Sequence, residues 1–315
     1  MVKLRNAKYC NLKLLLIFLV MYGHLIEPQL HRSQMLFVQY RAIYLFHMPM
    51  FCFLSGLFLN SCDSCKRQFQ KCLSLYVLMQ ALAVCFGKGK VDPLTPYWHL
   101  WYILSCSAWS GLGWLWYRYF RGKGKGAILA ISVILACLSG LLPGIGRALS
   151  LSRTVAFLPY FLLGLFLQPQ FPWERLQKLS LVGLLMALAL FAAWGDQIPT
   201  EFLYHASPYG QLGSGPALRL LCYAVGALIC LFLLAFMPSR RFPFTKAGAN
   251  TMPAYLLHAP FALLLRRQHL AWPLYLLICP GFLYASYKLL QWHSALYGIV
   301  PTERRVAVVC LSKDI

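Results

Sequence analysis

Three histidines stand inside long apolar stretches, where an ionisable side chain is costly and therefore points to a function. His24 is followed by Glu27, so that both side chains lie on one face of a helix, one turn apart. A carboxylate in that position orients an imidazole and raises its basicity, as a general base for a hydroxyl group requires. The alternative is that His24 lies at a membrane interface and only makes a structural hydrogen bond.

The other two histidines each precede a proline by two residues. His47 belongs to a polar and aromatic stripe at helical spacing between Tyr40 and Ser55, which is either part of a site or a packing seam. His258 stands in the middle of a later apolar run. Because consecutive membrane helices run in opposite directions, His24 and His47 are predicted to lie at similar depth, as members of one site would.

The composition indicates that the apolar stretches carrying these histidines lie in a membrane. Of 315 residues, 60% are apolar and 12% are charged, with a mean hydropathy of +0.61, whereas soluble domains carry about 25% charged residues. The apolar runs predict an all-α fold, a polytopic bundle of about ten transmembrane helices without a soluble domain. The predicted spans are 10–27, 41–60, 69–86, 98–117, 127–143, 153–169, 179–195, 217–237, 251–265 and 271–290.

The basic residues predict the orientation of the chain. The first apolar run lacks the small-residue cleavage site of a signal peptide, so it is predicted to be retained as a span. Most of the 29 Lys and Arg residues then fall on alternate loops, which places both termini in the cytoplasm of a multi-pass cell-membrane protein. A single domain is predicted over 1–315, with a short cytoplasmic tail at 291–315.

The charge and the cysteines exclude other classes. The net charge of +21 is spread over alternating loops and faces anionic lipid, so no nucleic-acid partner is predicted. A basic cytoplasmic face also attracts a phosphorylated donor such as coenzyme A. Most of the 12 cysteines lie in apolar runs and are predicted to be reduced thiols. Cys62, Cys65 and Cys72 fall short of a four-ligand set, so no metal site is predicted.

Five segments, in order, resemble the acyltransferase-3 family, in particular its fucose-4-O-acetylase-like branch. The resemblance covers residues 8–290, and the segments are "NLKLLLIFLVMYGHLIEP" (11–28), "LFHMPMFCFLSGLF" (45–58), "YWHLWYILSCSAW" (97–109), "SRTVAFLPYFLLGLFL" (152–167) and "GANTMPAYLLHAP" (248–260). The resemblance implies a ten-helix enzyme that moves an acetyl group from cytoplasmic acetyl-CoA to a sugar hydroxyl of a surface or exported glycan. Acetyl-CoA is then a substrate, and no bound cofactor is implied.

The resemblance also assigns residues. The histidines of the family's first and second helices correspond to His24 and His47, and the arginine of its sixth span corresponds to Arg153. Relatives commonly carry Asp near the start of the first helix, where this chain has Asn11. The amide keeps the hydrogen-bonding capacity of that position and removes its charge.

Together these observations predict the roles of the candidate residues. His24, Glu27 and His47 are the catalytic candidates, by direct transfer or through an acetyl-histidine intermediate. Candidates for binding the donor phosphate or the oxyanion are Arg41, Arg153 and Asn11. Candidates for stacking on the carbohydrate acceptor are Trp98, Tyr204, His205 and Tyr209. The last three belong to the loop 195–215. The alternative is that this segment is an ordinary turn-rich loop at the membrane interface.

The alternative function is a transporter or flippase of a lipid-linked sugar. Such a protein uses the same buried His and Arg residues as a polar pathway. The sequence shows no inverted repeat and no matching pair of broken helices, which favours the acyltransferase.

Overall fold

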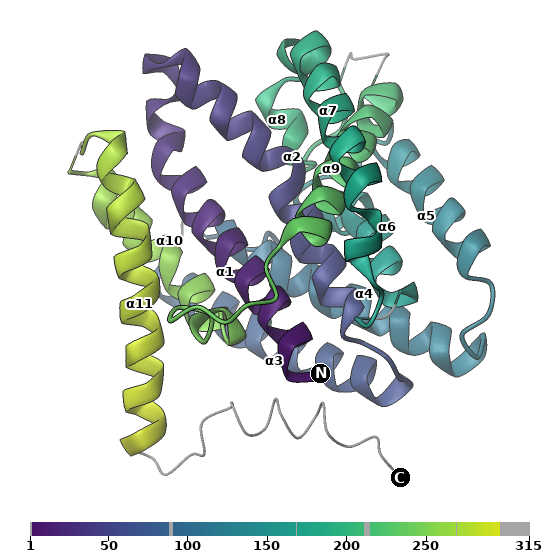
Figure 1. The fold of residues 1–315 in the computed structure, drawn as a ribbon, viewed down its shortest axis with the longest axis horizontal. Coiled ribbons are helices and arrows are strands. Elements are labelled where there is room, and N and C mark those ends of the chain that lie inside the picture. The colour runs from purple at the N-terminus through teal and green to yellow at the C-terminus, as the bar shows by residue number, and fades with distance from the viewer. Residues whose placement is uncertain (1, 88–90, 168, 211–214, 269, 297–315) are drawn as a thin grey trace. The chain divides into compact units, whose positions relative to one another are not determined.

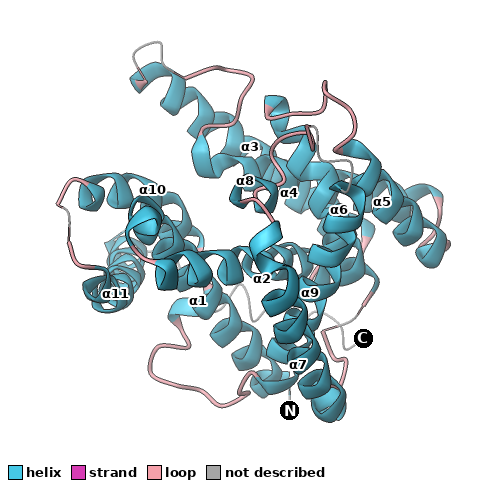
Figure 2. Ribbon diagram, turned by 90° about the horizontal axis from the view of Figure 1, so that it is seen from above, coloured by secondary structure: helices cyan, strands magenta, loops and turns pink. Residues whose placement is uncertain are grey.

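A computed structural model of the chain describes residues 2–87, 91–167, 169–210, 215–268 and 270–296 (Figure 1). This described part contains eleven α-helices and no strand (Figure 2), which confirms the predicted all-α fold. The helices are α1 (Val2–Ile26), α2 (Gln34–Leu57), α3 (Cys62–Phe86), α4 (Trp101–Tyr119), α5 (Lys125–Ser139), α6 (Leu151–Phe166), α7 (Gln177–Trp194), α8 (Thr200–Leu203), α9 (Gly215–Phe236), α10 (Met252–Arg266) and α11 (Trp272–Leu296).

Each predicted span falls on one of these helices, and the four-residue α8 is the additional one. The helix α11 extends to Leu296, so the predicted tail at 291–315 begins with the end of a helix. Residues 297–315 of that tail lie outside the described residues.

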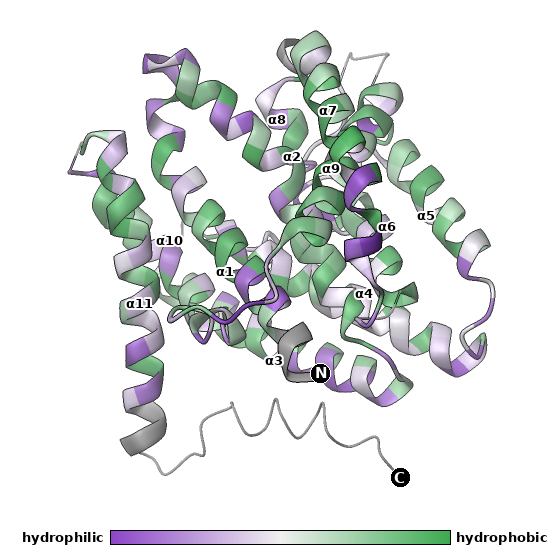
Figure 3. Ribbon diagram, viewed as in Figure 1, coloured by the Kyte–Doolittle hydropathy of each residue, from purple (hydrophilic) through white to green (hydrophobic). Residues whose placement is uncertain are grey.

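Six helical segments in the described ranges are long and apolar enough to cross a membrane. They are Ala7–Arg32, Cys62–Phe86, Ala148–Phe166, Trp173–Trp194, Gly215–Phe236 and Trp272–Trp292. Figure 3 shows hydrophobic residues along most of α5 and α7. The apolar helix α5 has 15 residues and α10 has 15, fewer than the ~20 that a perpendicular crossing needs. The structure thus supports six spans, and the count of ten stays a prediction.

Prolines stand inside four of the helices, at Pro49, Pro159, Pro260 and Pro280. A proline removes one backbone hydrogen bond, which membrane helices tolerate when neighbouring groups satisfy the freed carbonyl.

The helices form two compact units. The first comprises 1–40 and 237–315, and the second comprises 41–236, so α2 begins in one and continues in the other. In the first unit, α1 packs against α10, α11 and the 3-10 turn η6 (Ala247–Ala249). Gly248 of this turn faces the carbonyl of Cys10 so closely that a Cβ atom would overlap it. The turn therefore approaches the backbone of α1 in a way that only glycine permits.

In the second unit, the pairs α3–α4, α5–α6 and α7–α9 pack side by side, and α4 and α6 are also in contact. Two glycines let α2 and α6 touch through their backbones: Gly56 faces the carbonyl of Phe161, and Gly164 faces the carbonyl of Phe53. Small residues at helix contacts are the usual device for close packing in membranes. This contact holds the C-terminal turns of α2, which follow His47 along the helix.

Candidate active site

The first unit contains a cluster at the end of α1 that is built on Arg266. Its Nη2 donates to Oε2 of Glu27 at 2.5 Å, and Nη2 and Nε donate to the carbonyl oxygen of His24 at 2.8 and 3.2 Å. The guanidinium therefore joins the last residue of α10 to the last turn of α1. The side chains of Arg266 and Glu27 are 25% and 33% exposed, so this ion pair is only partly screened by solvent.

The imidazole of His24 lies beside the same carboxylate. Its Nδ1 is 3.8 Å from Oε2 of Glu27, which is near enough for a charge interaction and beyond hydrogen-bond distance. The α-helix ends at Ile26 and continues as a 3-10 turn, η1 (Glu27–Arg32), with Pro28 in its first turn. The predicted proximity of His24 and Glu27 is therefore seen, with Arg266 as the group that anchors the carboxylate.

A second histidine meets His24. The ring of His258, from α10, is fully buried and stacks on the ring of His24, with centroids 5.4 Å apart and planes inclined by 19°. Nδ1 of His258 bonds to the carbonyl oxygen of Tyr255. A carbonyl only accepts, so Nδ1 carries the proton, and Nε2 is the basic nitrogen of the neutral ring.

A hollow with about 410 Å³ of empty space opens next to this cluster. Its lining includes Gln29, Arg32, Arg266 and Tyr275. Nε2 of Gln29 donates to the carbonyl of Leu270 at 2.9 Å and to Oη of Tyr275 at 3.1 Å, which fixes the amide at the wall. Amide, phenol and guanidinium groups are the partners that hydroxyl-bearing ligands use.

Asn11 occupies the other end of α1, about 20 Å along the helix from His24. Its amide nitrogen donates to the carbonyls of Pro238 and Arg240 at 2.9 and 3.0 Å, and its oxygen accepts from Oγ1 of Thr245 at 2.6 Å. All three bonds hold the segment before α10. The structure therefore shows Asn11 in a structural arrangement, away from the His24 cluster.

The second unit holds the other candidates. Nδ1 of His47 bonds to the carbonyl of Ile43 at 2.8 Å, and the ring of His47 meets Tyr44 edge-on at 4.7 Å. Tyr44 in turn meets Tyr204 edge-on at 5.4 Å. Nε of Arg153 donates to the carbonyl of Tyr204 at 3.1 Å. His47, Tyr204 and Arg153 are thereby brought into one chain of contacts.

The loop that follows α7 is held by two arginines, Arg153 through the carbonyl of Tyr204 and Arg41 through the carbonyl of Ile198. The guanidinium of Arg153 lies 4.8 Å from the centre of the Trp101 ring, a cation–π arrangement. Arg41 is buried and donates to the carbonyl of Ile198 through Nη2.

Trp98 lies in the 3-10 turn η2 (Trp98–Leu100), with a positive φ of 33°, and its ring meets His99 edge-on at 6.3 Å.

His205 and Tyr209 are buried around Arg219, a residue of α9. Arg219 is 1% exposed and donates through Nη1 to the carbonyl of Ala136 at 2.5 Å and to Oγ of Ser139 at 3.1 Å. Its guanidinium lies 4.6 Å from the centre of the Tyr209 ring. Arg219 therefore caps the end of α5, where a cation is favoured.

Burial, reinforced by the positive charges of Arg219 and Arg153, holds the pKa of His205 well below its ordinary value of 6.5. His205 also has a left-handed φ of 49°. Burial raises the pKa of Tyr209 to about 12, and its hydroxyl donates to the carbonyl of Cys137 at 2.8 Å. Both rings are enclosed by protein, which suits packing more than stacking on a sugar; the assignment to the acceptor stays a prediction.

Three of these residues were not singled out from the sequence: Arg266, Arg219 and Trp101. A signal for Arg266 appears only once the structure has defined the first unit. Among the described residues of the first unit, Glu27 is the only one with a carboxylate, so a basic residue at a helix end was its natural partner. Nothing in the local sequence of Arg219 or Trp101 indicates their partners.

The described cysteines are free thiols. Within the described ranges, no group of three or more His, Cys, Asp or Glu side chains is arranged to hold a metal ion.

The described part of the chain is all-helical, with several apolar helices and a stacked histidine pair beside an anchored carboxylate, which are the features of a membrane protein with a candidate acid–base site. The acyltransferase-3 family model, described as an acyltransferase domain, matches residues 9–291 and so spans both units. The chain belongs to this family and is a membrane acyltransferase. No curated protein and no solved structure matches it significantly.

Proposed function

We propose that the protein transfers an acetyl group from cytoplasmic acetyl-CoA to a hydroxyl group of a carbohydrate acceptor in a cell-surface or exported glycan, with His24 as the general base. The observation that carries the proposal is the His24 imidazole, held 3.8 Å from a carboxylate that Arg266 anchors. An acyltransferase that uses an alcohol needs such a base, and a fixed carboxylate stabilises the imidazolium that forms.

The proposed reaction uses His24 twice. Its imidazole accepts the proton of the acceptor hydroxyl while the hydroxyl oxygen attacks the carbonyl carbon of the thioester. The tetrahedral intermediate then collapses, the carbon–sulfur bond breaks, and the imidazolium returns the proton to the thiolate of coenzyme A. Glu27 stabilises the charged ring in between. General-base catalysis of this kind contributes typically 10²–10⁴-fold to the rate.

His258 supports His24 in this scheme. The two rings are stacked with their centroids 5.4 Å apart, so the packing of His258 holds the His24 ring in place.

The hollow beside Glu27 is the proposed entry for the acceptor hydroxyl. Its wall carries Gln29, Tyr275 and Arg266, whose donors suit the hydroxyl groups of a sugar. The roles predicted for residues of the second unit remain part of the proposal: His47 as a further catalytic candidate, Arg41 and Arg153 for the oxyanion or the donor phosphates, and Trp98 and Tyr204 for the acceptor.

The proposed topology has both termini in the cytoplasm and ten spans. Cysteine labelling tests it: positions near 66, 123 and 243 are expected on the cytoplasmic side, and those near 32, 90 and 205 on the outer side. Positions 123 and 205 on the same side would contradict it.

The function is tested by mass spectrometry of surface glycans from cells with and without the protein. The proposal expects sugar units heavier by one acetyl group only where the protein is present. Unchanged glycans, with purified folded protein that neither binds nor consumes acetyl-CoA, would contradict the proposal and favour the transport of a lipid-linked sugar.

A further inference from the structure

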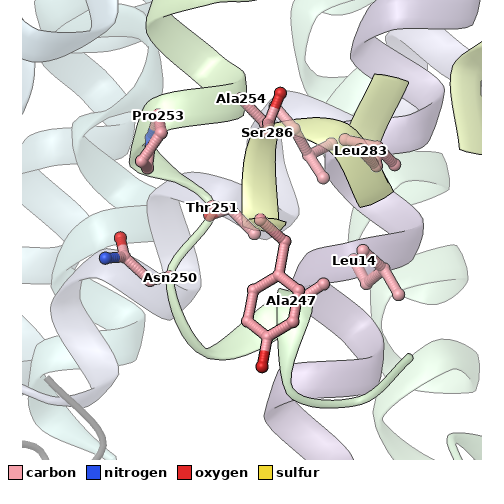
Figure 4. Close-up of a pocket in the computed structure, with 10 residues that line it drawn as sticks. Leu14, Ala247, Asn250, Thr251, Pro253, Ala254, Leu283 and Ser286 are labelled. Carbon is pink, nitrogen blue, oxygen red and sulfur yellow. The ribbon is translucent and has the colours of Figure 1, made fainter. Parts of the chain in front are cut away.

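A second hollow of the first unit is too small for a ligand. It lies between α1, α11 and the segment before α10, and Figure 4 shows Ala254 and Ser286 close together on one side of it. Its cavity volume is about 10 Å³, and a single water molecule needs about 10–15 Å³ on this measure. The exposed charges of the second unit are the stronger feature.

The second unit carries a basic patch where α3 begins and α4 ends. Residues 61–71 and 117–125 contain seven Lys and Arg residues and one carboxylate, that of Asp63. Six of the basic side chains are exposed and make up the patch: Lys66, Arg67, Lys71, Arg118, Arg121 and Lys123. Positive charge with so few acidic neighbours attracts anionic groups.

The packing of α3 against α4 brings the two segments together. Sγ of Cys65 lies 3.2 Å from the position that a Cβ atom would take at Gly113, and Oη of Tyr117 donates to the carbonyl of Leu59 at 3.4 Å. The first turns of α3 therefore lie beside the last turns of α4. The basic residues that follow these contacts on each helix lie at the same end of the pair.

The loop between α4 and α5 is held by Trp116. Nε1 of this residue donates to the carbonyl of Lys123 at 2.7 Å, and its buried ring lies 4.8 Å from the ring of Phe166, at the end of α6. Nζ of Lys125 donates to the carbonyl of Phe166 at 3.3 Å. The backbone of the loop is therefore tied to the helices, while the side chains of Arg121 and Lys123 are exposed.

Two large aromatic side chains stand between the arginines of the patch. Tyr119 is 73% exposed and Phe120 is 59% exposed, and they follow Arg118 and precede Arg121. Aromatic rings beside Lys and Arg residues are typical of the level at which a membrane helix meets the lipid headgroups. The patch therefore has the composition of a membrane–water interface.

We infer that this basic patch is a binding site for the headgroups of anionic phospholipids, with the lipid phosphates among its six basic side chains and the rings of Tyr119 and Phe120 toward the acyl chains. Clusters of about four to eight Lys and Arg residues next to a membrane helix bind anionic lipid in this way. Guanidinium groups, which the patch has in three of its six members, bind phosphate oxygens in pairs. The inference concerns one end of the second unit and does not depend on the reaction that the protein catalyses.

Two double variants remove charge from the patch: Arg121→Gln with Lys123→Gln in the loop, and Lys66→Gln with Arg67→Gln in α3. All four side chains are exposed, so neither variant disturbs the packing of the helices. Purified full-length protein in neutral detergent is titrated with phosphatidylglycerol, or with phosphatidylcholine of the same acyl chains. The bound lipid is measured by native mass spectrometry, and thermal unfolding without added lipid shows that each variant is folded.

The matched control is Arg147→Gln with Arg267→Gln, which removes two positive charges from other exposed positions. The wild type should bind phosphatidylglycerol at least about tenfold more tightly than phosphatidylcholine. Each patch variant should weaken phosphatidylglycerol about tenfold, or ~1.4 kcal/mol, and the control should stay within twofold of the wild type.

Three results would overturn the inference. The first is equal binding of the two lipids by the wild type. The second is an equal loss in the control, which would mean that only the net charge matters. The third is a loss of coenzyme A binding in the patch variants with unchanged phosphatidylglycerol, which would assign the patch to the phosphates of a soluble donor.

Discussion

The ion pair between Arg266 and Glu27 should couple the end of α10 to the end of α1. The guanidinium and the carboxylate are 2.5 Å apart, and hydrogen bonds that involve charged groups contribute about 1.5–3 kcal/mol when they are buried. These side chains are 25% and 33% exposed, and exposed pairs contribute about 0.2–1 kcal/mol. The expected coupling free energy lies between the two ranges, at about 1 kcal/mol.

A double-mutant cycle measures this coupling. The free energy of unfolding is measured at equilibrium in mixed detergent micelles for Glu27→Gln, Arg266→Gln and the double variant. The changes in the two single variants are then subtracted from the change in the double variant to give the coupling free energy. Arg267→Gln, at the exposed neighbouring position, is the control and should show no coupling with Glu27. A coupling for Arg266 no larger than that for Arg267 would refute the assignment of Arg266 as the anchor of the carboxylate.

Three further effects should be visible in the stability of the purified protein. Asn11→Asp should destabilise it by about 1–3 kcal/mol, because a carboxylate cannot donate to the two carbonyls that the amide satisfies; a denaturation midpoint equal to that of the wild type would contradict this role. Gly164→Ala should lower the free energy of unfolding by about 1–3 kcal/mol, because the new methyl group overlaps the carbonyl of Phe53. The control Gly281→Ala, where the methyl group meets open space, should be neutral or slightly stabilising. Equal denaturation midpoints for the two variants would refute the close packing of α2 and α6. In the unfolded chain His205 takes up a proton below pH 6.5, whereas in the folded protein it does not. The free energy of unfolding should therefore fall as the pH drops below 6.5, by up to ~1.4 kcal/mol per pH unit. The denaturation midpoint should depend less on pH in His205→Gln, and an unchanged dependence would show that another group titrates.

The helices could be predicted from the sequence because apolar length and helix breakers are local properties. The predicted span 217–237 corresponds to α9 and the predicted span 69–86 to α3, with ends displaced by a few residues. The start of α3 differs more than that of α9, since Ser61 and Ser64 form a capping box that begins the helix at Cys62 and extends it through a polar turn. The spacing of His24 and Glu27 was predictable for the same reason, because one turn of helix fixes it.

Contacts between distant residues could not be predicted in this way. Arg266 and Glu27 are separated by 239 positions, and neither local sequence indicates the other. The stacking of His258 on His24 depends on how α10 packs against α1. Likewise, the loop sequence around Tyr209 predicts an exposed aromatic surface. In the structure the ring of Tyr209 is buried and packs against the guanidinium of Arg219, a contact that the local sequence does not indicate.

The role of His24 as the general base is tested by the turnover of acetyl-CoA by purified His24→Ala. We expect a loss of about 10²–10⁴-fold with expression and thermal stability close to wild type, and full activity for the control His31→Ala, whose side chain is exposed. If His24→Ala kept more than about a tenth of wild-type turnover, which is above what loss of a base permits, the claim would be contradicted, and His47 would become the candidate base.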